Sequence, residues 1–257
     1  MGMSDSWKVT YPHGSIEFID AFRRTVFDYD EVDRVLDEFF GRSGTSVRRL
    51  CELGAGTGTH LMRLAGKGYE CTGVDADEES VAIARLRTLE SGADLSFQVL
   101  DVKSALPQDI FDAAMVLFVP ISISDMHELA VRAADIIRPG GFFVSLMLAE
   151  DPEYADKPTA TYRDMEFALR GEQPVIRFNF YWKKQQRIDW EAVYMFDPGD
   201  GVRLERNLTR LDPLSGESHL ELPTNIYRYV ERLDISRCKA TQRPPMAVEV
   251  LDVFQRV

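Results

Sequence analysis

Glycine and acidic residues are concentrated where one short apolar segment of the sequence ends and a predicted helix begins. Residues 49–60 read Arg-Leu-Cys-Glu-Leu-Gly-Ala-Gly-Thr-Gly-Thr-His, so that Gly54, Gly56 and Gly58 are each two positions apart. Glycine tolerates positive φ and lets backbone amides approach a ligand closely. The N-terminus of the following helix, expected over residues 58–67, favours an anionic group at this loop. The loop therefore predicts a binding site for a phosphate or a carboxylate.

A single acid closes the next apolar segment. Residues 69–75 read Tyr-Glu-Cys-Thr-Gly-Val-Asp and end on Asp75, which follows Gly54 at a distance of about twenty residues. In a strand–helix–strand unit, an acid at this distance accepts hydrogen bonds from the hydroxyls of a ribose. The spacing therefore predicts that the loop and Asp75 together bind a nucleoside.

The glycine spacing distinguishes two classes of nucleoside-binding protein. Dinucleotide-binding proteins carry G-x-G-x-x-G, whereas this sequence carries G-x-G-x-G with Glu52 two residues before the first glycine. That pattern resembles motif I of the class I S-adenosylmethionine (SAM)-dependent methyltransferases. The resemblance implies that Gly54, Gly56 and Gly58 approach the methionine part of SAM closely. It also implies that Glu52 lies near the methionine ammonium group and that Asp75 holds the ribose hydroxyls.

The acid after the third apolar segment extends this resemblance. Residues 95–102 alternate and then reach Asp101, as the third strand of the family does. The resemblance implies that Asp101 accepts a hydrogen bond from the adenine amino group and that Val102 contacts adenine through its backbone. The alternative is that Asp101 caps the turn before Ser104.

The following segments predict the rest of a parallel sheet. Residues 110–118 are almost continuously apolar, as in a strand buried on both faces. Apolar residues form one stripe over 125–138, which predicts a helix that Pro139-Gly140-Gly141 would end, before a fifth strand at 142–148. The resemblance thus spans roughly residues 47–148. It implies that Phe118 lies beside both cofactor and acceptor, and that Ser122 in the next loop faces the acceptor.

The N-terminal residues 1–40 are expected to form a helical lid, with helices over 15–24 and 30–40. In small-molecule methyltransferases of this class, such a segment lies over the cofactor and lines the acceptor pocket. This resemblance makes Tyr29 a candidate cofactor contact and Tyr11 a candidate acceptor contact, although both rings can equally serve to pack the helices together. His13 is a candidate base or acceptor ligand, or simply an exposed histidine in a Pro-His-Gly turn.

The second half of the sequence predicts a smaller β-rich region over 151–222, after the core at 41–150. A short helix is expected over 161–170, followed by alternating strands over 175–182, 188–196 and 202–211. This layout resembles small-molecule N-methyltransferases that act on amino sugars and glycine. In these relatives an appended antiparallel sheet shapes the acceptor pocket or an oligomer interface. The resemblance therefore allows the protein to be a homodimer.

The last segment, 223–257, is expected to complete the sheet with a helix over 225–233 and strands over 234–240 and 246–257. The whole chain is thus predicted to be one α/β domain. Its fold would be a Rossmann-like, doubly wound seven-stranded methyltransferase sheet, with the N-terminal lid and the appended sheet.

Composition excludes several classes of function. A net charge of −12 and a pI near 4.9 argue against a nucleic-acid partner, because that binding depends on Lys and Arg. Arg203, Arg206 and Arg210 are expected to be an ordinary solvated strand surface. The sequence shows no metal-ligand cluster, signal peptide or apolar run of transmembrane length. Three cysteines without metal or redox spacing fit a reducing compartment, so no membrane partner and a cytoplasmic location are expected.

These observations predict an enzyme that transfers a methyl group from SAM to a small-molecule acceptor, with N-methylation preferred and no metal required. O-methylation of a small molecule is the main alternative. A nicotinamide-dependent (NAD(P)) Rossmann oxidoreductase, disfavoured by the glycine spacing, and a non-catalytic SAM-binding module also remain open. The catalytic base, if the reaction needs one, is not identified by the sequence.

Overall fold

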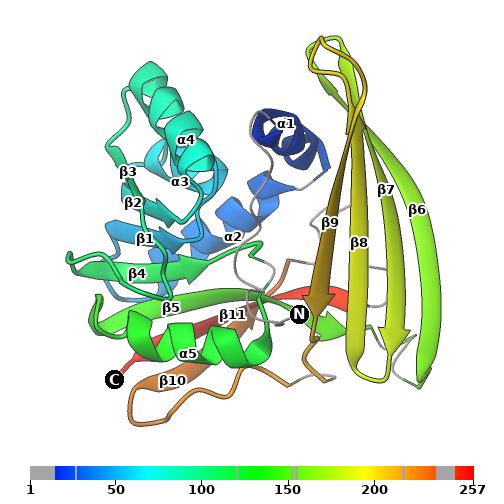
Figure 1. Ribbon diagram of the computed structural model, residues 1–257. Coiled ribbons are helices and arrows are strands. Elements are labelled where there is room, and N and C mark those ends of the chain that lie inside the picture. Colours follow the sequence, from blue (N-terminus) through cyan, green and yellow to red (C-terminus); the bar gives the residue numbers. More distant parts are fainter. Residues whose placement is uncertain are drawn as a thin grey trace.

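Two separate sheets organise the chain (Figure 1). The computed structural model describes residues 15–26, 28–119, 121–151, 153, 156–215, 218–235 and 247–257. The described helices are α1 (Ile16–Val26), α2 (Tyr29–Arg42), α3 (Thr59–Ala65), α4 (Glu78–Ser91) and α5 (Ile123–Ala133). Sheet A contains β1 (Arg49–Leu53), β2 (Glu70–Asp75), β3 (Leu95–Val99), β4 (Phe111–Val116), β5 (Ile137–Glu150), β10 (Tyr227–Leu233) and β11 (Ala247–Arg256). Sheet B contains β6 (Thr159–Arg170), β7 (Gln173–Lys184), β8 (Arg187–Phe196) and β9 (Arg203–Leu211).

Sheet A confirms the predicted doubly wound architecture. Its strand order is β10-β11-β5-β4-β1-β2-β3, with β1 to β5 parallel and β11 antiparallel to both of its neighbours. One apolar core joins the sheet to α2, α3 and α4, and a second joins its other face to α5. The chain reverses its winding between β1 and β4, which lie side by side. In open parallel sheets, ligands bind beyond the carboxyl ends of the strands at such a switch point.

Three of the predicted helices are wrong in whole or in part. The segment predicted as a helix over 161–170 is β6, which pairs with β7 from Thr159 to Arg170. The segment over 225–233 is β10, which pairs with β11 up to the Leu233–Leu251 pair. In both segments, partners distant in sequence outweigh local helix propensity. Residues 234 and 235, the first two of the strand predicted over 234–240, are not part of a strand. Residues 236–246 lie outside the described part of the chain.

The third correction concerns the junction between α5 and β5. α5 ends at Ala133, and Pro139-Gly140-Gly141 lies inside β5 rather than ending the helix. The pairing of β4 with β5 shifts register between Phe111 and Ala113 at this point. A Cβ atom on Gly141 would lie 2.5 Å from the backbone oxygen of Asp112. The glycine therefore lets β5 approach β4 closely, which is a role in strand packing.

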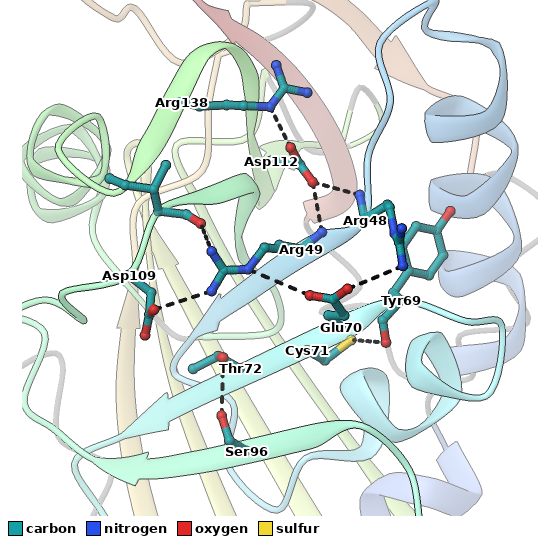
Figure 2. Close-up of polar contacts among 11 residues, drawn as sticks. Arg48, Arg49, Tyr69, Glu70, Cys71, Thr72, Ser96, Asp109, Asp112 and Arg138 are labelled. Atoms are coloured by element: carbon teal, nitrogen blue, oxygen red, sulfur yellow. Dashed lines mark hydrogen bonds and ion pairs between the residues drawn. The ribbon is translucent and has the colours of Figure 1, made fainter.

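Charged side chains at the amino-terminal edge of sheet A form hydrogen bonds and ion pairs that link neighbouring strands (Figure 2). Asp112 accepts hydrogen bonds from the backbone N–H groups of Arg48 and Arg49 at 2.7 and 2.8 Å, and from Arg138 Nε at 2.5 Å. Glu70 forms ion pairs with both Arg48 and Arg49. Burial alone would raise the pKa of Asp112, but the hydrogen bonds from Arg49, Arg138 and Arg48 lower it overall. This edge therefore serves to join β1, β4 and β5.

We expect Asp112→Asn to reduce the free energy of unfolding by about 1–3 kcal/mol at pH 7, since it removes an ionised acceptor of three hydrogen bonds. A carboxyl whose pKa is lowered by folding stabilises the protein above its unfolded pKa, and this contribution is lost as the pH falls below about 4. Urea unfolding at pH 7 and pH 3 tests this, with the exposed Asp109→Asn as control. An equal loss of stability at both pH values would contradict it.

The two faces of sheet B differ sharply in burial. One face carries exposed apolar side chains, including Met165, Phe167 and Leu204. The other, here called the inner face, is buried and faces the carboxyl-terminal edge of sheet A (Figure 1). A buried ion pair joins the two sheets, because Lys183 Nζ on β7 lies 2.5 Å from Glu150 Oε1 at the end of β5. The predicted strands over 175–182, 188–196 and 202–211 are confirmed as β7, β8 and β9.

Other sequence predictions can be placed in the fold. Arg203, Arg206 and Arg210 lie on β9 and form ion pairs with neighbouring acids, as expected of a strand surface. Cys51 and Cys71 are buried free thiols, whereas Cys238 lies outside the described residues. No helix in the described part of the chain is both long and apolar enough to cross a bilayer.

Candidate functional site

The glycine loop lies at the carboxyl end of β1, and its three glycines have different surroundings. All three have positive φ, namely 84°, 53° and 78° for Gly54, Gly56 and Gly58. A Cβ atom on Gly54 would lie 2.7 Å from Val119 Cγ2, and one on Gly58 would collide with the ring of Phe97. A Cβ atom on Gly56 would meet nothing within 4 Å. Gly54 and Gly58 therefore permit close packing inside the protein, whereas Gly56 leaves open space for a ligand.

Asp75 lies at the end of β2 and is hydrogen-bonded to this loop. Its Oδ2 accepts from the N–H of Gly56 at 2.7 Å, and its Oδ1 accepts from the N–H of Asp77 at 2.9 Å. Burial raises the pKa of Asp75, while these two hydrogen bonds act in the opposite direction. Each carboxylate oxygen can accept more than one hydrogen bond. Asp75 therefore holds the loop in place and still has acceptor capacity for the hydroxyls of a ligand.

A buried acid and a buried histidine lie behind the loop. Glu52, at the end of β1, is 2% exposed, and its Oε2 has no hydrogen-bond partner among the described residues. His60, in the first turn of α3, is 4% exposed, and in the same part of the chain its Nε2 has no partner either. Burial raises the pKa of Glu52 to about 8. Since buried polar atoms are nearly always hydrogen-bonded in native proteins, these two atoms indicate a ligand that completes the site.

The other nitrogen of His60 is firmly held. Nδ1 lies 2.5 Å from Asp33 Oδ1 on α2, and Asp33 is fully buried. The second oxygen of Asp33 accepts a hydrogen bond from Arg63 Nε at 2.7 Å. A carboxylate that bonds one imidazole nitrogen fixes the ring orientation and the role of the other nitrogen. The Asp33–His60 pair therefore points Nε2 in one direction.

Two aromatic rings complete the wall around His60. The Phe118 ring stacks on the imidazole at 5.2 Å between centroids, and the Tyr29 ring meets it edge-on at 4.6 Å. Phe118 has φ of 52°, which is uncommon for a residue other than glycine. Backbone strain of this kind is concentrated at binding sites. The structure thus brings together Tyr29 and Phe118, both predicted from the sequence, with the glycine loop and Glu52.

The remaining predicted site residues are placed less directly. Asp101 lies two residues beyond β3 and accepts a hydrogen bond from the N–H of Lys103 at 3.0 Å, as a turn cap does. The carbonyl of Val102 accepts from Arg132 at 2.6 Å. Ser122 caps α5 by accepting from the N–H of Asp125. Tyr11 and His13 lie outside the described residues.

The inner face of sheet B carries a buried polar network that the sequence analysis did not identify. Glu166 Oε2 accepts hydrogen bonds from Arg177 Nε at 2.8 Å and from Asn179 Nδ2 at 2.7 Å. Asn179 also donates to Asp164 at 2.6 Å and accepts from Trp190 Nε1 at 3.0 Å. Arg177 and Asn179 are at most 1% exposed, and none of the residues that the structure describes bonds Glu166 Oε1. This network can bind a polar molecule.

Helix α1 connects this network to the glycine loop (Figure 1). On one side, Asp20 accepts a hydrogen bond from the hydroxyl of Thr57 and pairs with Arg87 on α4 at 2.5 Å. On the other side, Phe22 lies edge-on to Tyr194 and under the guanidinium of Arg177, 4.7 Å from the ring centroid. The loop and the inner face of sheet B therefore belong to one connected region.

The residues that the sequence analysis missed left only weak signals. His60 directly follows the glycine loop, at the second position of a helix, but its partner Asp33 is 27 residues earlier. Arg177 and Asn179 occupy alternate positions of a segment, 174–182, that is otherwise apolar. The alternation was evident, but it did not show that the polar side would be the buried one.

Comparison with known proteins finds similarity to methyltransferases. Residues 50–141 match the family described as "Methyltransferase domain". A ubiquinone biosynthesis O-methyltransferase of Paramagnetospirillum magneticum is 29% identical over 206 residues, which covers 77% of this chain and 75% of that protein. The enzyme with the same name from Aeromonas salmonicida is 27% identical over 155 residues, 55% of this chain and 64% of its own length.

Solved structures share the fold at low sequence identity. A SAM-dependent methyltransferase from Clostridium acetobutylicum superposes with a TM-score of 0.68 at 12% identity, over 93% of this chain and 96% of its own. A sugar N-methyltransferase from Streptoalloteichus superposes with a TM-score of 0.65 at 16% identity, over 100% of this chain and 97% of its own. These similarities extend over nearly the whole chain and so include sheet B.

Proposed function

We propose that this chain is a class I SAM-dependent methyltransferase that transfers the methyl group to an amine of a small polar molecule. The acceptor would lie between the glycine loop and the inner face of sheet B. The observation that carries this proposal is the buried network on that face, in which the Oε1 atom of Glu166 has no partner among the described residues. A carboxylate in such a position favours an acceptor that donates hydrogen bonds, as a neutral amine does.

The residues around the loop fit SAM. The open side of Gly56 would admit the cofactor, Asp75 would accept hydrogen bonds from the ribose hydroxyls, and Glu52 Oε2 would accept one from the methionine ammonium group. Asp101 and Val102 would lie at the adenine, and Tyr29 and Phe118 would cover the methionine side. SAM supplies an activated methyl group on a sulfonium leaving group. The protein contributes by holding the acceptor in line with that group, an effect that can reach several kcal/mol.

Two considerations bear on the atom that is methylated. A neutral amine needs no base at the moment of attack, whereas a phenol or alcohol must lose a proton. The carboxylates Asp164 and Glu166 on the inner face would attract an amine, which favours N-methylation. O-methylation is the second candidate, because the two relatives compared by sequence are named O-methyltransferases. The structural neighbour named as a sugar N-methyltransferase supports the first.

A paired acceptor panel with tritiated SAM tests the proposal. Each pair would contain an amino sugar and the sugar with a hydroxyl in place of the amine, alongside simple phenols. We expect methyl transfer to the amine member of a pair, and Glu166→Gln to lower its kcat/KM by about 10- to 100-fold, the range of hydrogen bonds to charged groups. Glu172→Gln, which removes an exposed carboxylate in the β6–β7 turn, is the matched control. Transfer to phenols alone would establish the O-methyltransferase alternative instead.

A further inference from the structure

Two buried polar atoms, Glu52 Oε2 and His60 Nε2, have no hydrogen-bond partner in the part of the chain that the structure describes. When its carboxyl is ionised, Glu52 accepts hydrogen bonds and cannot donate them. His60 Nε2 can donate a hydrogen bond when the ring is protonated. Each side chain comes from a different element, β1 for Glu52 and α3 for His60, and the glycine loop joins these elements. Glu52 and His60 are close enough for the charge of each to shift the pKa of the other. An acceptor and a donor near each other match the ammonium and carboxylate of an α-amino acid.

We propose that His60 is a positioning residue that donates its Nε2–H to the carboxylate of the methionine part of SAM, while Glu52 accepts from the ammonium group. This inference rests on the proposed binding of the methionine end of SAM at the glycine loop. It adds a histidine that binds the free carboxylate, so the site distinguishes a ligand with the complete amino acid from one that lacks the carboxylate.

The surroundings of His60 favour the protonated ring. Burial alone would lower its pKa, but the charge of Asp33, the hydrogen bond that the ring donates to Asp33 and the charge of Glu52 raise it overall. Burial raises the pKa of Asp33, while the charge of His60 and its hydrogen bond act in the opposite direction. Arg63 Nε lies 2.7 Å from the other oxygen of Asp33. An imidazolium has two N–H donors, one for Asp33 and one for a ligand. The charged and titratable groups around His60 are Asp33, Arg63, Glu52 and Tyr29.

The alternative role for an Asp–His pair is a general base that removes a proton from the acceptor. That role needs Nε2 to face the acceptor. The contacts of His60 are instead with Asp33, Tyr29 and Phe118, and its other charged neighbour is Glu52 at the base of the glycine loop. The charged groups that raise its pKa are Asp33 and Glu52. This arrangement favours a role at the cofactor.

Three ligands separate the parts of the proposed contact. S-Adenosylhomocysteine carries both the ammonium and the carboxylate, its decarboxylated amine carries only the ammonium, and 5′-methylthioadenosine carries neither. By calorimetry, we expect the wild-type protein to bind S-adenosylhomocysteine about 10- to 100-fold more tightly than the decarboxylated amine. A ratio near one would overturn the proposal without any substitution being made.

Two substitutions of His60 provide a matched pair. The amide of His60→Asn can replace Nδ1 toward Asp33 but has no atom at the position of Nε2, whereas His60→Gln can place a donor near Nε2. We expect His60→Asn to weaken S-adenosylhomocysteine by about 10- to 100-fold and to change the affinity for the other two ligands by less than about twofold. His60→Gln should recover part of the loss. Glu52→Gln should weaken both ligands that carry an ammonium group and leave 5′-methylthioadenosine unchanged.

The outcomes distinguish this inference from the proposed function. A wild-type protein that binds none of the three nucleosides would refute the cofactor site itself. A His60→Asn protein that loses affinity for all three equally would show a merely structural role. Unchanged affinity together with a lower kcat would establish the general-base role instead. If the variants unfold, nitrogen NMR of the wild-type imidazole keeps the inference testable, because Nε2 should respond to S-adenosylhomocysteine and not to 5′-methylthioadenosine.

Discussion

Replacing Asp75 by alanine is expected to weaken SAM binding by about 1.5–3 kcal/mol, the range of hydrogen bonds to a charged group. The carboxylate would lose its contacts with the ribose hydroxyls, and Gly56 would lose the acceptor of its N–H group at 2.7 Å. Gly56 is the loop glycine whose Cβ position faces open space, and without Asp75 the hydrogen bond that holds it in place is lost. Both effects reduce affinity, so the observed change should lie toward the upper end of this range.

Calorimetry with SAM and with S-adenosylhomocysteine measures this effect. Asp75→Asn separates its two parts, because an amide oxygen can still accept from Gly56 while its NH₂ group cannot accept from a ribose hydroxyl. Asp109→Asn, at the opposite edge of sheet A, controls for the change in net charge. If wild type and Asp75→Ala bind SAM equally well, Asp75 does not hold the ribose.

Replacing Arg177 by methionine is expected to lower the free energy of unfolding by about 3–5 kcal/mol, because it leaves a buried carboxylate without its cation. Arg177 is 1% exposed and donates to Glu166 through two nitrogens, at 2.8 and 2.5 Å. Its guanidinium also lies against the rings of Phe22 and Trp190, so part of the loss comes from these contacts. Glu166 would remain bonded to Asn179 alone.

Chemical denaturation of the variant measures the loss, and a second substitution tests its cause. In Arg177→Met with Glu166→Leu, no unpaired charge remains, so much of the stability should return. Arg206→Met is the control on the same sheet. Arg206 is exposed and pairs with Glu191, and exposed ion pairs contribute about 0–1 kcal/mol. Equal losses in the single and the double variant would show that the contacts of Arg177, rather than its charge, stabilise sheet B.

The core of sheet A and its binding loop were predictable because their signals are local. Gly54, Gly56 and Gly58 have positive φ as their residue type suggested, and Asp75 lies at the end of β2 as its spacing required. Strand β4 is mostly buried, and its sequence reads as an almost continuous apolar run that only Asp112 interrupts. The helix predicted over 30–40 is α2, and the structure packs its apolar residues against the sheet. In each case a property of a few neighbouring residues is enough to define the structure.

Other features depend on partners distant in sequence, and only the folded chain shows them. Residues 159–170 are a strand because β7 offers hydrogen bonds along their whole length, and residues 227–233 are a strand because β11 does. The alternation in β7 defined two faces but not which one would be buried, because Arg177 and Asn179 are buried only once Glu166 and Asp164 from β6 lie beside them. His60 likewise becomes an oriented side chain only when α2 brings Asp33 to within 2.5 Å. Local patterns specify backbone geometry, whereas the energy of burying a charge depends on which opposite charge the tertiary fold places next to it.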